Sequence, residues 1–226
     1  SAAPWDSFRG WDMKPDRVSA RLLTAMLVAV AAAIVMGFGT LRESGDILLR
    51  DVGDAYVLVV GGICKDPDVA ATQKQSLDEL CTLLTANLKL MPGRLTVLVE
   101  PSGARRSAQD APTAENVTAA LKRIASSAKP GDLFVFWYKG QANTIQDTLR
   151  INLEGPDMTD AQLAAALAPI QCNMQVIVLD CPGAGMAVKP LTRAGRVIMC
   201  GARSDQPYAT SFTETFVPAL SDPTAD

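Results

Sequence analysis

Four short segments hold the polar and nucleophilic residues that could do chemistry, and each follows a predicted β-strand. They are Gly61-Gly62-Ile63-Cys64, Lys139-Gly140-Gln141-Ala142, Asp180-Cys181-Pro182-Gly183 and Cys200-Gly201-Ala202-Arg203. If the strands are parallel, their carboxyl ends meet at one edge of the sheet, which is where such proteins bind ligands. We therefore expect any functional site of this chain at that edge.

The chemistry available there is limited, because the chain has no histidine. This removes the commonest general base, the partner of most nucleophilic cysteines and serines, and the commonest zinc ligand. The five cysteines are scattered without a C-x-x-C spacing, so we predict no metal site. Neither a G-x-G-x-x-G nor a G-x-x-x-x-G-K-[ST] motif is present, and we predict no cofactor.

The charge of the chain argues against nucleic acid as a partner. The net charge is −3, and acidic and basic residues are interspersed along the sequence. A nucleic-acid-binding protein usually presents a basic face, and no such run of charge is seen.

Strands and helices alternate along the chain from residue 55. Apolar runs predict strands at residues 56–62, 95–99, 133–138, 149–153, 175–179 and 196–199. Between them lie apolar stripes at helical spacing: Leu77, Leu80, Leu84 and Leu88; Val117, Ala120, Leu121 and Ile124 after the N-cap Thr113; and Leu163, Ala166, Leu167 and Ile170 after a Thr159–Gln162 capping box. A last amphipathic segment covers residues 212–220. The pattern predicts an α/β fold with a mostly parallel, doubly wound sheet and helices on both faces.

Two of the segments that follow strands resemble the caspase/legumain group of cysteine peptidases (clan CD). Residues 132–142 (DLFVFWYKGQA) resemble the clan's hydrophobic strand followed by S-G-H-G, in which the histidine is the catalytic base. Residues 176–185 (VIVLDCPGAG) resemble its second segment, a strand followed by D-A-C-H-S-G, which carries the nucleophilic cysteine. The resemblance covers about residues 55–203 and implies a caspase-like fold.

Both catalytic positions of that clan are altered in this sequence. The histidine position is Gln141, and the nucleophile position is Pro182, with Cys181 one residue early. A one-residue shift at a strand end turns a side chain to the other face, so Cys181 is not expected to point where the nucleophile would. Cys181 is then a small buried hydrophobic residue, a disulfide partner of Cys200, Cys64 or Cys172, or a reactive thiol. We expect no catalytic residues.

The loop after the last predicted strand is where the resemblance places part of a peptide pocket. Arg203, Asp205 and Gln206 occupy it, and together with Gln141 they are candidate binding residues. The alternative is a solvated loop without a binding role.

An uncharged segment of twenty residues lies between Arg21 and Arg42. This length spans ~30 Å of hydrocarbon as a helix. We expect an N-terminal tail at 1–21, a transmembrane helix from Leu22 to Leu41, a connector at 42–54 and the caspase-like domain at 55–226. A buried core helix or a cleaved signal peptide is the alternative.

Basic residues are more frequent before the apolar segment than after it, which favours a cytoplasmic N-terminus and a domain on the exoplasmic or periplasmic side. Trp5 and Trp11 could lie at the membrane interface or contact a neighbouring protein. The leading hypothesis is a non-catalytic, membrane-anchored accessory subunit of a multi-subunit membrane complex. Its partners would be other membrane subunits, contacted through the tail and the span, and the lipid bilayer. A peptide- or protein-binding module using the degenerate groove, and a hydrolase using Cys181, are the alternatives.

Overall fold

A computed structural model describes residues 53–99, 111–208 and 210–221. The expected tail, transmembrane segment and most of the connector, including Trp5, Trp11, Leu22 and Leu41, lie outside the described residues. Among the described helices, none combines the length and the apolar character needed to cross a membrane.

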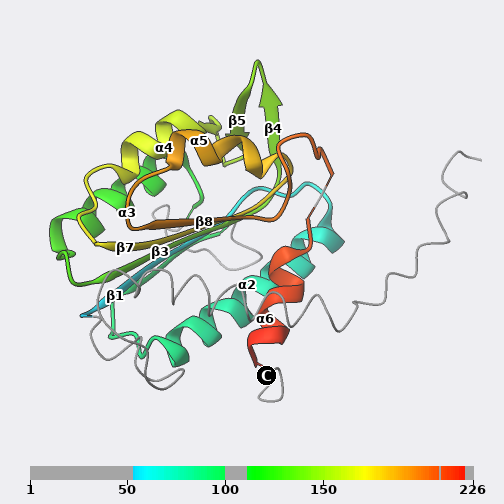
Figure 1. The fold of residues 1–226 in the computed structure, drawn as a ribbon. Helices are drawn as coiled ribbons and strands as arrows, with labels where there is room; N and C mark the ends of the chain where they lie inside the picture. The colour runs from blue at the N-terminus through cyan, green and yellow to red at the C-terminus, as the bar shows by residue number, and fades with distance from the viewer. Residues whose placement is uncertain (1–52, 100–110, 209, 222–226) are drawn as a thin grey trace, which may run out of the picture.

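Five parallel strands form the central sheet, in the order β2-β1-β3-β7-β8 (Figure 1). They are β1 (Ala55–Gly61), β2 (Leu95–Leu98), β3 (Leu133–Lys139), β7 (Met174–Asp180) and β8 (Arg196–Cys200). The predicted α/β fold with a mostly parallel sheet is confirmed. Strand order reverses between β1 and β3, and in doubly wound sheets a crevice for ligands opens beside such a point.

Helices cover both faces of this sheet (Figure 1). Helices α2 (Pro67–Asn87) and α6 (Phe212–Ser221) lie on one face, whereas α3 (Ala114–Ser127), α4 (Asp160–Leu167) and the short α5 (Val188–Leu191) lie on the other. The side chains of β1 alternate between these two faces. Val57 and Val59 pack in the core on the α2 and α6 side, and Leu58 and Val60 pack in the core on the α3 and α4 side. Alternation with both faces apolar is what a strand buried between two helical layers requires.

The helix starts follow from local sequence. The Thr113 hydroxyl accepts a hydrogen bond from the Asn116 amide at 3.1 Å, and the apolar stripe of α3 is buried along its length. In α4 the Thr159–Gln162 capping box forms as predicted. This helix ends at Leu167, earlier than the stripe suggests, although Ile170 remains fully buried in the turn that follows.

A smaller antiparallel sheet follows β3 and was only partly predicted. It consists of β4 (Ala142–Ile145), β5 (Thr148–Ile151) and β6 (Met158–Thr159). The β4–β5 hairpin turns through Gln146 and Asp147, whose φ angles are +49° and +58°. The hairpin projects from the molecule beside the carboxyl ends of the central strands (Figure 1).

Candidate functional site

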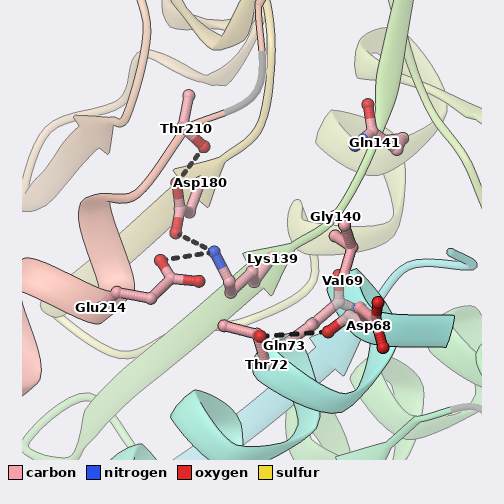
Figure 2. A pocket seen from close by; sticks show the side chains of 10 residues that line it. All are labelled: Asp68, Val69, Thr72, Gln73, Lys139, Gly140, Gln141, Asp180, Thr210 and Glu214. Carbon is pink, nitrogen blue, oxygen red and sulfur yellow. Dashed lines mark hydrogen bonds and ion pairs between the residues drawn. The ribbon is translucent and has the colours of Figure 1, made fainter. Parts of the chain in front are cut away.

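A polar pocket of about 260 Å³ lies at the carboxyl ends of the strands. Its walls come from the end of β3, the end of β7, the first turns of α2, the N-terminal part of α6 and Thr210, two residues before that helix (Figure 2). The lining residues are Asp68, Val69, Thr72, Gln73, Lys139, Gly140, Gln141, Asp180, Thr210 and Glu214. The pocket therefore lies at the edge where the sequence predicted a site.

Lys139 is the centre of a buried ion network in this pocket. Its Nζ lies 3.0 Å from Oδ2 of Asp180 and 2.8 Å from Oε2 of Glu214 (Figure 2). The side chains of Lys139 and Asp180 are 7% and 0% exposed, and that of Glu214 is 30% exposed. One ammonium group thus lies between two carboxylates, and the network carries a net negative charge.

Asp180 is held by hydroxyl groups as well as by Lys139. Thr213 donates to Oδ2 from its backbone amide at 2.8 Å and from its hydroxyl at 2.6 Å, and Thr210 donates to Oδ1. Burial is the largest single effect on this carboxyl group and raises its pKa. The Lys139 ammonium and the hydrogen bonds from Thr210 and Thr213 together outweigh burial, so the pKa of Asp180 lies below its ordinary value.

The network continues into the core through an indole. Nε1 of Trp137 donates to the Thr213 hydroxyl at 3.0 Å, and both side chains are buried. Among the described residues, no buried side-chain nitrogen or oxygen lacks a hydrogen-bond partner. Every buried polar group of the network is therefore satisfied within the protein itself.

Sequence reasoning placed Lys139 and Asp180 in segments that follow strands but gave neither a role, and it did not single out Thr213 or Glu214. One signal was available. Lys139 ends the uncharged run Leu133–Tyr138, and a charge at the end of a strand buried on both faces requires a partner. The partners themselves are distant in the sequence, 41 residues away for Asp180 and 75 for Glu214.

Gln141 lines the pocket but lies apart from the ion network (Figure 2). Its backbone carbonyl accepts a hydrogen bond of 2.6 Å from the Tyr138 hydroxyl, and its backbone also pairs with Asn152. An amide side chain can exchange hydrogen bonds with a ligand but cannot remove a proton from one.

Cys181 and Pro182 are both buried and lie outside the lining of the pocket. Burial, followed by the nearby Asp180 carboxylate and Cys200, raises the pKa of Cys181 well above the ordinary value for a thiol. In the described structure Cys181, Cys200, Cys64 and Cys172 form no disulfide bond. Cys181 thus occupies the position of a small core residue.

The other predicted binding residues lie elsewhere. Arg203 and Asp205 are exposed and pair with each other, with Nε to Oδ1 at 3.0 Å and Nη2 to Oδ2 at 2.5 Å. The backbone carbonyl of Gln206 accepts a hydrogen bond of 2.8 Å from the amide of Gly183, which ties this loop to the turn after β7. These three residues are not among those that line the pocket with Gln141.

No group of three or more Asp, Glu, Cys or His residues within the described ranges is placed to hold a metal ion. Lys139 also lies between the two most buried carboxylates of the pocket and neutralises one of them. What the pocket offers a ligand is a set of hydroxyl, amide and carboxylate groups around a volume of about 260 Å³.

The fold and the pocket define the chain as a doubly wound parallel α/β protein with a closed ion network at the carboxyl edge of its sheet. Comparison with known proteins adds no closer relationship. No protein-family model matches the chain, and no curated protein matches it.

Proposed function

We propose that this chain is a non-catalytic, caspase-like domain that is anchored to a membrane by residues 22–41 and serves as an accessory subunit of a multi-subunit membrane complex. The single observation that supports the proposal best is the closed network of Lys139, Asp180 and Glu214. It occupies the edge of the sheet where a peptidase of this fold would need its nucleophile and base.

Hydrolysis is disfavoured by the chemistry of that edge. A cysteine peptidase needs a thiolate and a base within hydrogen-bond reach of it. Cys181 is fully buried, its pKa is raised, and Gln141 cannot accept a proton from it. At the two positions that carry the catalytic residues in the clan, the chain therefore offers neither an accessible thiolate nor a base.

A structural role fits the pocket better than recognition of a peptide. A peptide-binding module of this ancestry should keep an open groove lined by arginine and glutamine. Here Arg203 is turned to its neighbour Asp205, and Lys139, Thr213 and Glu214 fill the edge. The remaining volume of about 260 Å³ is below the ~300–1,000 Å³ of typical ligand pockets.

Partners and location are part of the same proposal. The N-terminal tail would lie in the cytoplasm, the domain would lie on the exoplasmic or periplasmic side, and the span would contact other membrane subunits within the lipid bilayer. A chain with net charge −3 and dispersed basic residues lacks the basic face that nucleic-acid binding usually needs.

Membrane anchoring is tested first by fractionation. The variant Val30→Arg/Ile34→Arg places two charges in the apolar segment, and each costs about 2.5–3.5 kcal/mol of insertion free energy. We expect the wild-type chain and the matched control Val30→Leu/Ile34→Leu to resist carbonate extraction, and the arginine variant to be released. Extraction of the wild-type chain would contradict the anchor.

The accessory-subunit role is tested by native purification in mild detergent, with sizing and mass-spectrometric identification of co-migrating proteins. Stoichiometric co-migration with integral membrane proteins at moderate salt is the expected result. Wild-type protein that runs as a lone monomer or homodimer would contradict the proposal and would favour the peptide-binding alternative. Peptidase activity abolished by Cys181→Ala would instead establish the hydrolase.

A further inference from the structure

Helix α6 packs on the face of the sheet that α2 also covers, and its N-terminal part reaches the pocket at the carboxyl edge. It lies beside α2 on one face of the molecule (Figure 1). The segment that leads to it from β8 includes residues 203–208, all of which are exposed. Helix α6 thus follows the last strand of the sheet and completes, with α2, the cover of one face.

The apolar attachment of α6 is confined to one side of the helix. Phe216 and Val217 are 5% and 3% exposed, and the rings of Phe212 and Phe216 lie 6.0 and 5.6 Å from the ring of Trp137. Pro218 lies inside the helix and has no N–H to donate, which weakens its last turn.

The polar contacts of α6 are made with the ion pair of Lys139 and Asp180, which does not need the helix in order to form. Lys139 and Asp180 are register partners in β3 and β7 and neutralise each other at 3.0 Å. Glu214 adds a second carboxylate to this pair, and Thr213 adds hydrogen bonds to a carboxylate that Lys139 already neutralises. Departure of α6 would therefore leave no lone buried charge behind, which keeps the free energy of opening well below that of unfolding the sheet.

We propose that α6 is a hinged strap that opens as a unit while the five-stranded sheet stays folded, and that its opening widens the pocket. Two of the lining residues support this step, because Glu214 belongs to α6 and Thr210 lies just before it. When α6 is closed, the pocket has a volume of about 260 Å³. When it is open, the pocket joins the apolar surface of Trp137 and becomes a groove along the ends of β3 and β7.

Hydrogen–deuterium exchange of the full-length protein in detergent, with peptides resolved by mass spectrometry, tests this proposal. In the wild-type protein we expect amides of residues 213–221 to exchange at least about tenfold faster than those of residues 134–138 and 175–179, as local opening below the global free energy requires. Equal protection of these three segments over a range of low urea concentrations would overturn the proposal.

Two variants separate opening of α6 from loss of the whole fold. Thr213→Val removes the hydroxyl shared by Trp137 and Asp180, and leaving a buried group unpaired should speed exchange in α6 by roughly five- to a hundredfold. Glu214→Gln, at a part-exposed site, should speed it by about two- to fivefold. Glu154→Gln is a matched control at an exposed carboxylate and should change nothing.

In both variants the exchange of β3 and β7 should stay at its wild-type rate. Equally faster exchange of α6 and of the sheet in Thr213→Val would show that this hydroxyl stabilises the whole domain. If Glu214→Gln also speeds the exchange of both equally, the strap is excluded. Faster exchange confined to α6 in either variant supports the strap.

Discussion

Lys139 and Asp180 face each other across β3 and β7, and their side chains meet at 3.0 Å while the amide of Gly140 donates to the backbone carbonyl of Asp180 at 3.1 Å. The pair is thus set by strand register and not by a flexible loop. A buried pair of this kind specifies one arrangement of the sheet edge, because neither charge tolerates the loss of the other.

Lys139→Met should strongly destabilise the domain. It leaves Asp180 buried without its counter-ion, and breaking a buried pair from one side costs about 3–5 kcal/mol. The measurement is the free energy of unfolding in urea, followed by circular dichroism. Lys189→Met, at an exposed lysine, is the matched control and should change the free energy by less than about 0.5 kcal/mol.

The double variant Lys139→Met/Asp180→Asn should recover part of that loss. Asparagine has no charge to leave unpaired, and its carbonyl oxygen can still accept from Thr213. If the double variant loses as much unfolding free energy as the two single variants together, the two side chains act independently.

The stability of the domain should fall on acidification, in part through Asp180. The pKa of Asp180 is lowered in the folded protein, so its contribution is fully present above the unfolded value of ~3.9 and is lost as pH falls through the folded value. Unfolding free energies measured between pH 7 and pH 3 should decline more steeply for the wild-type protein than for Asp180→Asn. Parallel declines would show that other carboxyl groups carry the effect.

Cys181 should be unreactive in the native protein. Its burial and raised pKa keep the thiol protonated and out of contact with reagents. Cys172 is also buried, and burial raises its pKa to about 11. With iodoacetamide at pH 8, mass spectrometry should show Cys64 modified first, and Cys181 and Cys172 only after unfolding. Rapid native modification of Cys181 would contradict this order and would reopen its catalytic role.

Gly140 should not tolerate a side chain. A Cβ at this position would lie 2.8 Å from the Cα of Gly62 and 2.8 Å from the Tyr138 hydroxyl, where β1 and β3 end side by side. Gly140→Ala should therefore cost about 1–3 kcal/mol of unfolding free energy. Gly131→Ala is the control, because a Cβ there meets nothing within 4 Å. Equal losses of unfolding free energy in the two variants would show that Gly62 and Tyr138 move away from the added Cβ at little cost.

The parts of the fold that were predicted from sequence depend on local patterns. The run Leu133–Tyr138 has no charge and forms β3, and the stripe from Val117 to Ile124 behind Thr113 forms α3. Hydrophobic period and capping residues are contained within about ten residues of chain, so one sequence is sufficient to detect them.

The arrangement of the pocket depends on contacts between distant segments. No periodicity of α6 indicates that Glu214 meets Lys139, because that contact arises from how α6 crosses the sheet edge. Strand β4 was missed for a related reason. Ala142–Ile145 has three exposed residues and is extended only because it pairs with β5.

The separation of Lys139 and Glu214 also bears on how the chain is made. The two residues are 75 positions apart, and at roughly 5–20 residues per second their synthesis is separated by about 4–15 s. During that interval β7 and then β8 are synthesised, and only at its end does the helix that shields Trp137 follow. A polypeptide stalled or truncated before α6 would present this indole to chaperones and proteases, so the burial of Trp137 waits for the synthesis of α6.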